Sequence, residues 1–161
     1  MKTVCELNKC TGCMGCADVC AKAAITVHID IETCNAEIDD TKCIDCGACS
    51  RVCQVNNPVV LKKPVSWYQG WSRDETTREN CASGGFATEI SRAFISQGGI
   101  VFTCVFENGN FTYSAIETLE DLTKMAGSKY IKSNPAGMYK AVQKRLLAGE
   151  KVLLIGLPCH I

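Results

Sequence analysis

The sequence predicts an α+β protein: a small cysteine-rich domain over residues 1–60, a linker over 61–80, and part of an α/β domain over 81–161. Three observations predict this division. One cysteine pattern occurs twice near the N-terminus. Between its two copies, apolar and polar residues alternate as in a β-hairpin. From Cys81 onward, amphipathic helical segments alternate with apolar strands.

Each copy of the cysteine pattern has the spacing C-x2-C-x2-C-x3-C. Eight thiolates so spaced can hold two cubane iron–sulfur clusters, because three close cysteines bind one cube and the fourth crosses to the other. We therefore expect two 4Fe–4S clusters as cofactors. Cluster one would be held by Cys10, Cys13, Cys16 and Cys53, and cluster two by Cys43, Cys46, Cys49 and Cys20.

The doubled motif resembles the bacterial two-cluster ferredoxin, which implies a ferredoxin-like domain over residues 1–60. The proline usual after each fourth cysteine is replaced here by Ala21 and Gln54. Structural zinc is a weaker alternative, because zinc sites favour separated pairs of ligands. A disulfide scaffold is also weaker, because it needs an oxidising compartment and the N-terminal sequence has no apolar stretch for export. We therefore expect a cytoplasmic protein.

The segment between the two motifs is expected to form a hairpin from residues 25–31 and 34–39. His28 falls on the polar face and should be exposed to solvent. The residues expected on the face packed against the clusters are Ile25, Val27, Ile29 and Ile31.

Three cysteines outside the motif spacing, Cys5, Cys34 and Cys104, are expected to be structural. Buried thiols of this kind behave as small hydrophobic side chains. Cys104 alternates with apolar residues along a predicted strand, which places it among packed side chains. We therefore do not expect these three cysteines to bind iron.

The linker carries prolines and a polar run, a composition typical of a tether. Its aromatic segment, residues 67–71, should lie across the second domain's surface or form its first strand. A helix should follow Ser83-Gly84-Gly85, with Phe86, Ile90 and Phe94 recurring every four residues. Later expected elements are strands at 100–106 and 111–116 joined by an Asn-Gly turn, a short helix from Thr118 to Met125, a helix from Asn134 to Gly149, and a buried strand at 151–155.

Three loops of the second half could bind a ligand. Gly84-Gly85 opens a helix, where free N–H groups favour a phosphate. The segment Gly127-Ser-Lys-Tyr130 offers a cation and two hydroxyls, and the turn at 156–160 follows a buried strand, where ligands of α/β proteins sit. Taken alone, the first two loops are better explained as an ordinary helix start and a polar loop. In the third, Cys159 could be a ligand, a nucleophile or a packed thiol. The sequence contains no G-x-G-x-x-G or Walker A loop.

In their order, S-G-G, G-S-K-Y and G-x-P-C resemble the coenzyme F-420 hydrogenase/dehydrogenase β-subunit family, whose members in many anaerobes carry an N-terminal two-cluster ferredoxin domain. The resemblance implies an α/β flavin-binding domain and an FAD-dependent iron–sulfur oxidoreductase. Relatives usually read G-T-P-C-Q in the last turn, where this chain has Leu157 and His160. The flavin contacts that the resemblance implies are Ser83, Gly84, Gly85, Gly127, Ser128, Lys129, Tyr130, Gly156, Pro158, Cys159 and His160.

Family members continue well beyond the last turn, so we expect this chain to be a truncated or split protein, with a C-terminal half or another subunit as partner. The expected function is electron transfer between a redox partner or reduced carrier, the clusters and a flavin. Two alternatives stay open: a plain electron carrier whose second half is an interaction module, and an inactive truncated product. Lys plus Arg equals Asp plus Glu at 17 each, which argues against a nucleic-acid partner. The apolar stretch at 152–157 is too short to span a membrane.

Overall fold

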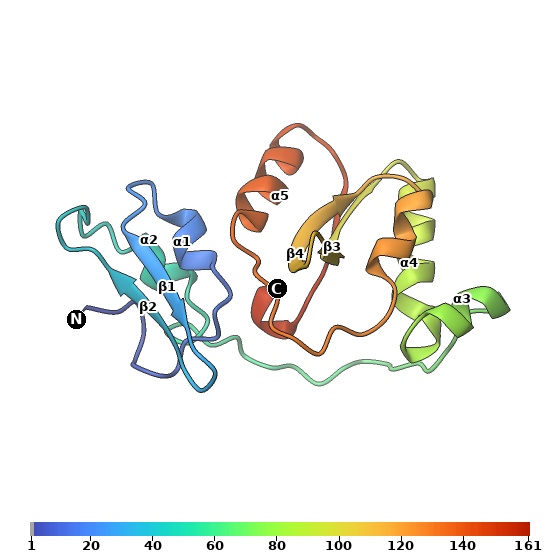
Figure 1. Ribbon diagram of the computed structural model, residues 1–161, viewed down its shortest axis with the longest axis horizontal. Helices are drawn as coiled ribbons and strands as arrows, with labels where there is room; N and C mark the ends of the chain where they lie inside the picture. Colours follow the sequence, from blue (N-terminus) through green and yellow to red (C-terminus); the bar gives the residue numbers. More distant parts are fainter. Residues whose placement is uncertain (1) are drawn as a thin grey trace. The chain divides into compact units, whose positions relative to one another are not determined.

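The computed structural model describes residues 2–161 (Figure 1). The chain forms two compact units. The first contains the chain through Leu61 together with residues 135–141 and 157–161, and the second contains residues 62–134 and 142–156. Helices and strands both contribute to the fold, so the predicted α+β class is confirmed at that level. Within residues 2–161, no helix combines the length and the apolar character that a membrane crossing requires.

The first unit is built around the predicted hairpin. Strands β1 (Ile25–Ile29) and β2 (Cys34–Ile38) pair antiparallel, with Ile25 opposite Ile38 and Ile29 opposite Cys34. The backbone N–H of Asp30 donates to the carbonyl of Thr33 at 2.8 Å and closes the turn. The hairpin therefore forms where the alternation of the sequence places it.

Only half of the predicted apolar face packs against the core. Ile25 and Val27 pack against a core that contains Cys16, whereas Ile29 is 43% exposed and Ile31 is fully exposed. The expectation for these last two residues is wrong, because β1 ends at Ile29 and the hairpin tip extends beyond the core. His28 is exposed as expected, with its Nε2 3.5 Å from a Glu37 carboxylate oxygen.

The sequence repeat reappears as two matching short helices, α1 (Gly15–Val19) and α2 (Ala48–Val52), which pack against each other. Each helix is preceded by a residue in the left-handed region, Met14 at φ 62° and Gly47 at φ 69°. Each ends at the fourth cysteine of its motif, Cys20 or Cys53, in extended conformation. Each copy of the motif therefore folds into the same loop and helix.

The second unit contains a three-stranded sheet in the order β4-β3-β5. Strand β3 (Ile100–Glu107) pairs antiparallel with β4 (Asn110–Ile116) through the predicted Asn-Gly turn, and parallel with β5 (Val152–Ile155). The helix α4 (Phe86–Ser96) and the 3-10 helix η2 (Glu120–Met125) pack on β3. The buried core between these elements consists of Val101, Val105, Ile116, Leu122 and Met125.

Helix α4 forms as predicted, but its buried face differs from the predicted apolar stripe. Phe86 is 56% exposed and Ile90 is 41% exposed, whereas Thr88 and Ser91 are buried. Phe94 does pack against the core. The small residues face inward because they allow the helix backbone to approach its neighbours, and the Ser91 hydroxyl donates to the Ala87 carbonyl at 2.8 Å, which satisfies it inside the helix.

Helix α5 (Met138–Leu147) begins later than the Asn134-Pro135 signal indicated. Asn134 instead forms an isolated parallel bridge with Thr112. The helix start is capped by Asp18, whose carboxylate accepts hydrogen bonds from the N–H groups of Gly137 at 2.8 Å and Tyr139 at 3.0 Å. A residue distant in sequence therefore supplies the cap.

The linker is mostly extended, and its aromatic segment forms no strand: Trp67 and Tyr68 are 80% and 92% exposed. The first-strand alternative is therefore wrong. Within the predicted polar run, the short helix α3 (Glu75–Asn80) forms, capped by Asp74, whose carboxylate accepts from the Thr77 N–H at 2.8 Å.

Candidate metal centre

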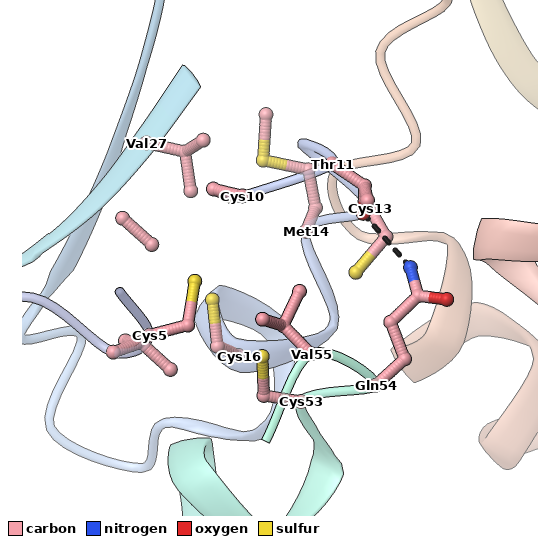
Figure 2. Close-up of a pocket in the computed structure, with 12 residues that line it drawn as sticks. Cys5, Cys10, Thr11, Cys13, Met14, Cys16, Val27, Cys53, Gln54 and Val55 are labelled. Atoms are coloured by element: carbon pink, nitrogen blue, oxygen red, sulfur yellow. Dashed lines mark hydrogen bonds between the residues drawn. The ribbon is translucent and has the colours of Figure 1, made fainter. Parts of the chain in front are cut away.

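Four predicted ligands of cluster one line a single pocket of the first unit. These are Cys10, Cys13, Cys16 and Cys53. Figure 2 shows their side chains around this pocket, with Cys53 contributed by the second copy of the motif. The remaining wall is largely apolar and comes from Val4, Met14, Val27, Ala36 and Val55.

The four predicted ligands of cluster two line another pocket in the same unit. Cys43, Cys46 and Cys49 come from the second copy, and Cys20 comes from the first. Each pocket thus combines three cysteines of one motif with the fourth cysteine of the other. The packed pair α1 and α2 produces this exchange, because each helix carries its fourth cysteine away from its own loop.

The residues present fit an iron–sulfur cube in both pockets. Thiolates are the ligands that such clusters use, and N–H groups that donate to cluster sulfur are a usual part of the site. Three backbone N–H groups already point at predicted ligand sulfurs: Gly12 to Cys10 at 3.4 Å, Ala24 to Cys20 at 3.3 Å, and Asp45 to Cys43 at 3.4 Å. Among the described residues, no three His, Cys, Asp or Glu side chains converge as a single metal ion requires. A cube does not require this, because each of its four thiolates binds a different iron.

Burial makes one of the predicted ligands a poor thiolate unless a metal binds it. Burial, together with the neighbouring Cys13 and Cys10, raises the pKa of Cys16 to about 12. Metal binding requires the deprotonated form, so cluster insertion must release this proton. If Cys16 is a ligand, assembly of the predicted cluster one would be coupled to pH through this thiol.

Two further cysteines lie beside the predicted ligands of cluster one. Cys5 and Cys34 are buried, with 8% and 6% of their surface exposed, as expected for small apolar residues. Burial, together with the neighbouring Cys53 and Cys10, raises the pKa of Cys5 to about 12. The Cys34 thiol donates to the Cys10 sulfur at 3.7 Å. The sequence placed these residues outside the ligand spacing but gave no sign that they contact ligands.

The Ser83–Gly85 segment forms the 3-10 helix η1 before α4, and its glycines are required by packing. A Cβ on Gly84 would lie 2.8 Å from the Trp71 Cβ, and a Cβ on Gly85 would lie 2.7 Å from the Thr77 Cγ2. The Ser72 N–H donates to the Gly84 carbonyl at 2.7 Å. These glycines therefore let residues 71–77 approach closely, whatever else they bind.

In the Gly127–Tyr130 segment, the cation that the sequence offers for a ligand is bound to the backbone. The Lys129 ammonium donates to the carbonyls of Met125 at 2.6 Å, Ala126 at 2.9 Å and Gly127 at 3.2 Å. Burial lowers the pKa of Lys129, against the opposing effect of Cys104 and Cys81. Ser128 and Tyr130 are exposed. Lys129 thus holds the end of η2 in this structure.

The last predicted flavin segment is divided between the two units. Gly156 belongs to the second unit, whereas Pro158, Cys159 and His160 form the 3-10 helix η3 (Pro158–His160) in the first. Gln54, which stands in the usual proline position, donates through Nε2 to the Thr11 hydroxyl at 2.8 Å and to the Cys159 carbonyl at 3.2 Å. The bond to Thr11 is drawn in Figure 2. Gln54 therefore ties the C-terminal turn to the loop of cluster one.

The second unit contains an open cleft of about 510 Å³ that the sequence did not indicate. The size falls within the usual range for small-molecule sites. Arg92 supplies a cation there and donates to the Thr77 hydroxyl at 3.1 Å. The residues that line the cleft are Asp74, Thr76, Thr77, Asn80, Cys81, Thr88, Arg92, Leu119, Leu122, Thr123 and Ala126. They come from three separate segments, so no spacing rule could have grouped them.

Comparison with known proteins finds two separate domain matches along the chain. Residues 9–57 match the 4Fe-4S dicluster domain, and residues 67–139 match the N-terminal domain of the coenzyme F420 hydrogenase/dehydrogenase β subunit. An uncharacterized protein of Methanocaldococcus jannaschii is 26% identical over 196 residues, which cover 97% of this chain and 52% of the relative. The chain thus spans about half the length of that relative. The resemblance seen in the sequence is confirmed, and the chain is a coenzyme F420 hydrogenase/dehydrogenase β-subunit-like protein with an N-terminal ferredoxin domain.

Proposed function

We propose that this chain carries electrons, one at a time, through two 4Fe–4S clusters and exchanges them with a flavin held by the second unit. The observation that carries the proposal is the pair of pockets, each lined by three cysteines of one motif and the fourth of the other. Cys10, Cys13, Cys16 and Cys53 would hold cluster one. Cys43, Cys46, Cys49 and Cys20 would hold cluster two.

The protein's own contribution is to fix the thiolates, to limit water and to donate hydrogen bonds to sulfur. Cys46 is exposed, whereas Cys16 is buried, so cluster two has a predicted ligand in direct contact with solvent. We propose that a redox partner protein or a reduced carrier exchanges electrons at cluster two. Close approach to an exposed edge shortens the distance for electron transfer.

The test of the cluster assignment is anaerobic reconstitution followed by iron and sulfide analysis of matched variants. The parent chain should hold about eight irons, as two cubes require. Cys20→Ser should lose the cluster bound by the second motif and keep about four irons. Cys104→Ser, on strand β3 of the second unit, is the control and should keep them all.

Spectroscopy of Cys20→Ser and of a further variant, Cys53→Ser, separates the two clusters. Each of these two variants should lose a different cluster signal. If Cys20→Ser instead removed the cluster bound by Cys10, Cys13 and Cys16, the exchange of fourth ligands would be wrong. Stoichiometric zinc without iron would reject the iron–sulfur assignment altogether.

The flavin part of the proposal rests on the family match and on the cleft of the second unit. FAD carries a diphosphate, and Arg92 is the cation that lines the cleft, together with hydroxyls of Thr76, Thr77, Thr88 and Thr123. A bound flavin would convert single electrons into two-electron chemistry. The eleven contacts inferred from the resemblance stay predictions beside this cleft.

Flavin binding is tested with two charge-removing variants that distinguish these sites. If the cleft holds the diphosphate, Arg92→Gln should weaken FAD binding about tenfold or more, as expected for loss of a charge-assisted hydrogen bond. Lys129→Gln should then have a smaller effect, because its ammonium is already bound to three carbonyls. The reverse order would favour the Gly127–Tyr130 loop. Failure of the parent chain, and of a chain extended to the length of its relatives, to bind FAD would leave a plain electron carrier.

A further inference from the structure

The two cluster pockets differ in the cysteines that surround them. The pocket of cluster two is lined by its four predicted ligands and, among the residues that the structure describes, by no other cysteine. The pocket of cluster one is lined by its four predicted ligands and also by Cys5. Cys34, at the start of β2, contacts the Cys10 sulfur as well. Cluster one is therefore surrounded by two extra thiols.

Both extra thiols lie beside predicted ligand sulfurs. Cys5 lines the pocket together with Cys53 and Cys10, which belong to the two different motifs. The Cys34 thiol donates to the Cys10 sulfur at 3.7 Å. Figure 2 shows the Cys5 side chain on the pocket wall together with Cys16 and Cys53. Because Cys5 and Cys34 are buried, water does not compete for these contacts.

We propose that Cys5 and Cys34 are hydrogen-bond donors to the ligand sulfurs of cluster one and raise its reduction potential. They are positioning and tuning residues for the cluster, and they bind no iron. This inference rests on the proposed function, because it requires cluster one to be held by Cys10 and Cys53.

The direction of the effect follows from charge. Reduction adds one electron to the cluster and increases the negative charge on its ligand sulfurs. A thiol that donates to such a sulfur stabilises the reduced form more than the oxidised form, so the potential rises. Loss of the donor therefore makes cluster one harder to reduce.

Cluster two has a contact of the opposite kind. A carboxylate oxygen of Asp45 lies 3.8 Å from the Cys43 sulfur and 2.7 Å from the Lys2 ammonium. Negative charge beside a ligand disfavours the reduced cluster. Replacement of Asp45 by asparagine should therefore raise the potential of cluster two, and it provides a matched change at the other site.

The experiment is an EPR-monitored redox titration of the reconstituted parent chain and four variants: Cys5→Ala, Cys5→Ser, Cys34→Ala and Asp45→Asn. Iron content is measured for each. In Cys5→Ala and Cys34→Ala, the ratio of reduced to oxidised cluster one at fixed potential should fall about twofold to tenfold, the range for one net hydrogen bond. A tenfold change corresponds to 59 mV for a one-electron couple. Cys5→Ser keeps a hydrogen-bond donor, so the reduction potential of cluster one should stay close to that of the parent chain. Asp45→Asn should raise the reduction potential of cluster two.

The outcomes are distinguishable. If both alanine variants keep their full iron content and neither cluster changes its reduction potential, the inference is overturned while the proposed clusters stand. Loss of about four irons in Cys5→Ala and also in Cys5→Ser would overturn it differently, because Cys5 would then be a ligand. If one alanine variant fails to assemble clusters, the other alanine variant and Cys5→Ser decide the result. A parent chain that assembles no iron–sulfur cluster at all would reject the proposed function itself.

Discussion

Asp18 should contribute measurably to stability, because it caps a helix that is remote in sequence. Its carboxylate accepts from the N–H groups of Gly137 at 2.8 Å and Tyr139 at 3.0 Å, at the start of α5. Both partners belong to the first unit, as does Asp18. The two bonds hold residues 137–139 beside helix α1.

The magnitude follows from the two bonds. Removal of a capping side chain costs about 0.5–2 kcal/mol, and bonds to a charged acceptor lie at the upper end of that range. Asp18→Ala should therefore lower the free energy of opening at the start of α5 by about 2 kcal/mol. Asp18→Asn keeps an oxygen acceptor and loses the charge that favours the helix N-terminus, so about 1 kcal/mol is expected.

Amide hydrogen exchange read by mass spectrometry measures this opening directly. A loss of 2 kcal/mol corresponds to roughly thirtyfold faster exchange of the peptide that contains residues 137–139. Asp30→Ala, in the exposed hairpin turn, is the control and should leave that peptide unchanged. The reasoning would be refuted by an exchange rate within twofold of the parent, or by an asparagine variant as impaired as the alanine variant.

Three more predictions concern single contacts. Gly85→Ala, at φ +78° with a Cβ contact of 2.7 Å, should lower thermal stability more than Gly109→Ala, at φ +77° in open space, and equal melting temperatures would contradict this. Hydrogen bonds from Thr41 and Lys42 lower the pKa of Asp39 from 3.8 to about 2. The ionised carboxylate therefore stabilises the fold above pH 3.8, and this stabilisation is lost as the pH falls through about 2. Carboxyl NMR should show the titration midpoint of Asp39 at a higher pH in Thr41→Val. Gln54→Ala should keep its iron but expose the C-terminal turn, measured as faster alkylation of the cysteine in that turn, and an unchanged rate would contradict the tether.

The local elements of the fold could be predicted because their signals are local. The alternation at residues 25–39 and the Asn108-Gly109 turn both depend on neighbouring residues, and both form as predicted. The predicted Thr118–Asp121 bond is equally local: the Thr118 hydroxyl accepts from the Asp121 N–H at 3.3 Å, although η2 begins at Glu120 with Leu119 as its N-cap. Helix α5 was placed too early because its cap, Asp18, is distant in the sequence and no local pattern indicates it.

The buried faces were harder to predict than the elements. Periodicity identified helix α4 but not its inward side, because burial depends on what packs against the helix. Phe86 and Ile90 are apolar yet exposed, and Ser91 is polar yet fully buried with an internal hydrogen bond. The hydrophobic pattern indicates which face of a helix could be buried. Only the elements that pack against the helix decide which face is buried.

The sequence alone determined which cysteines are candidates for the clusters and how they divide into two sets, because ligand spacing is set by the size of the cluster. The tertiary structure decided what surrounds each set. It placed Cys5 and Cys34 beside predicted ligands of cluster one, and Gln54 holds the turn at 158–160. It also brought Arg92 and the other lining residues together around a cleft. These contacts join residues far apart in the chain, and they exist only after folding has brought those segments together.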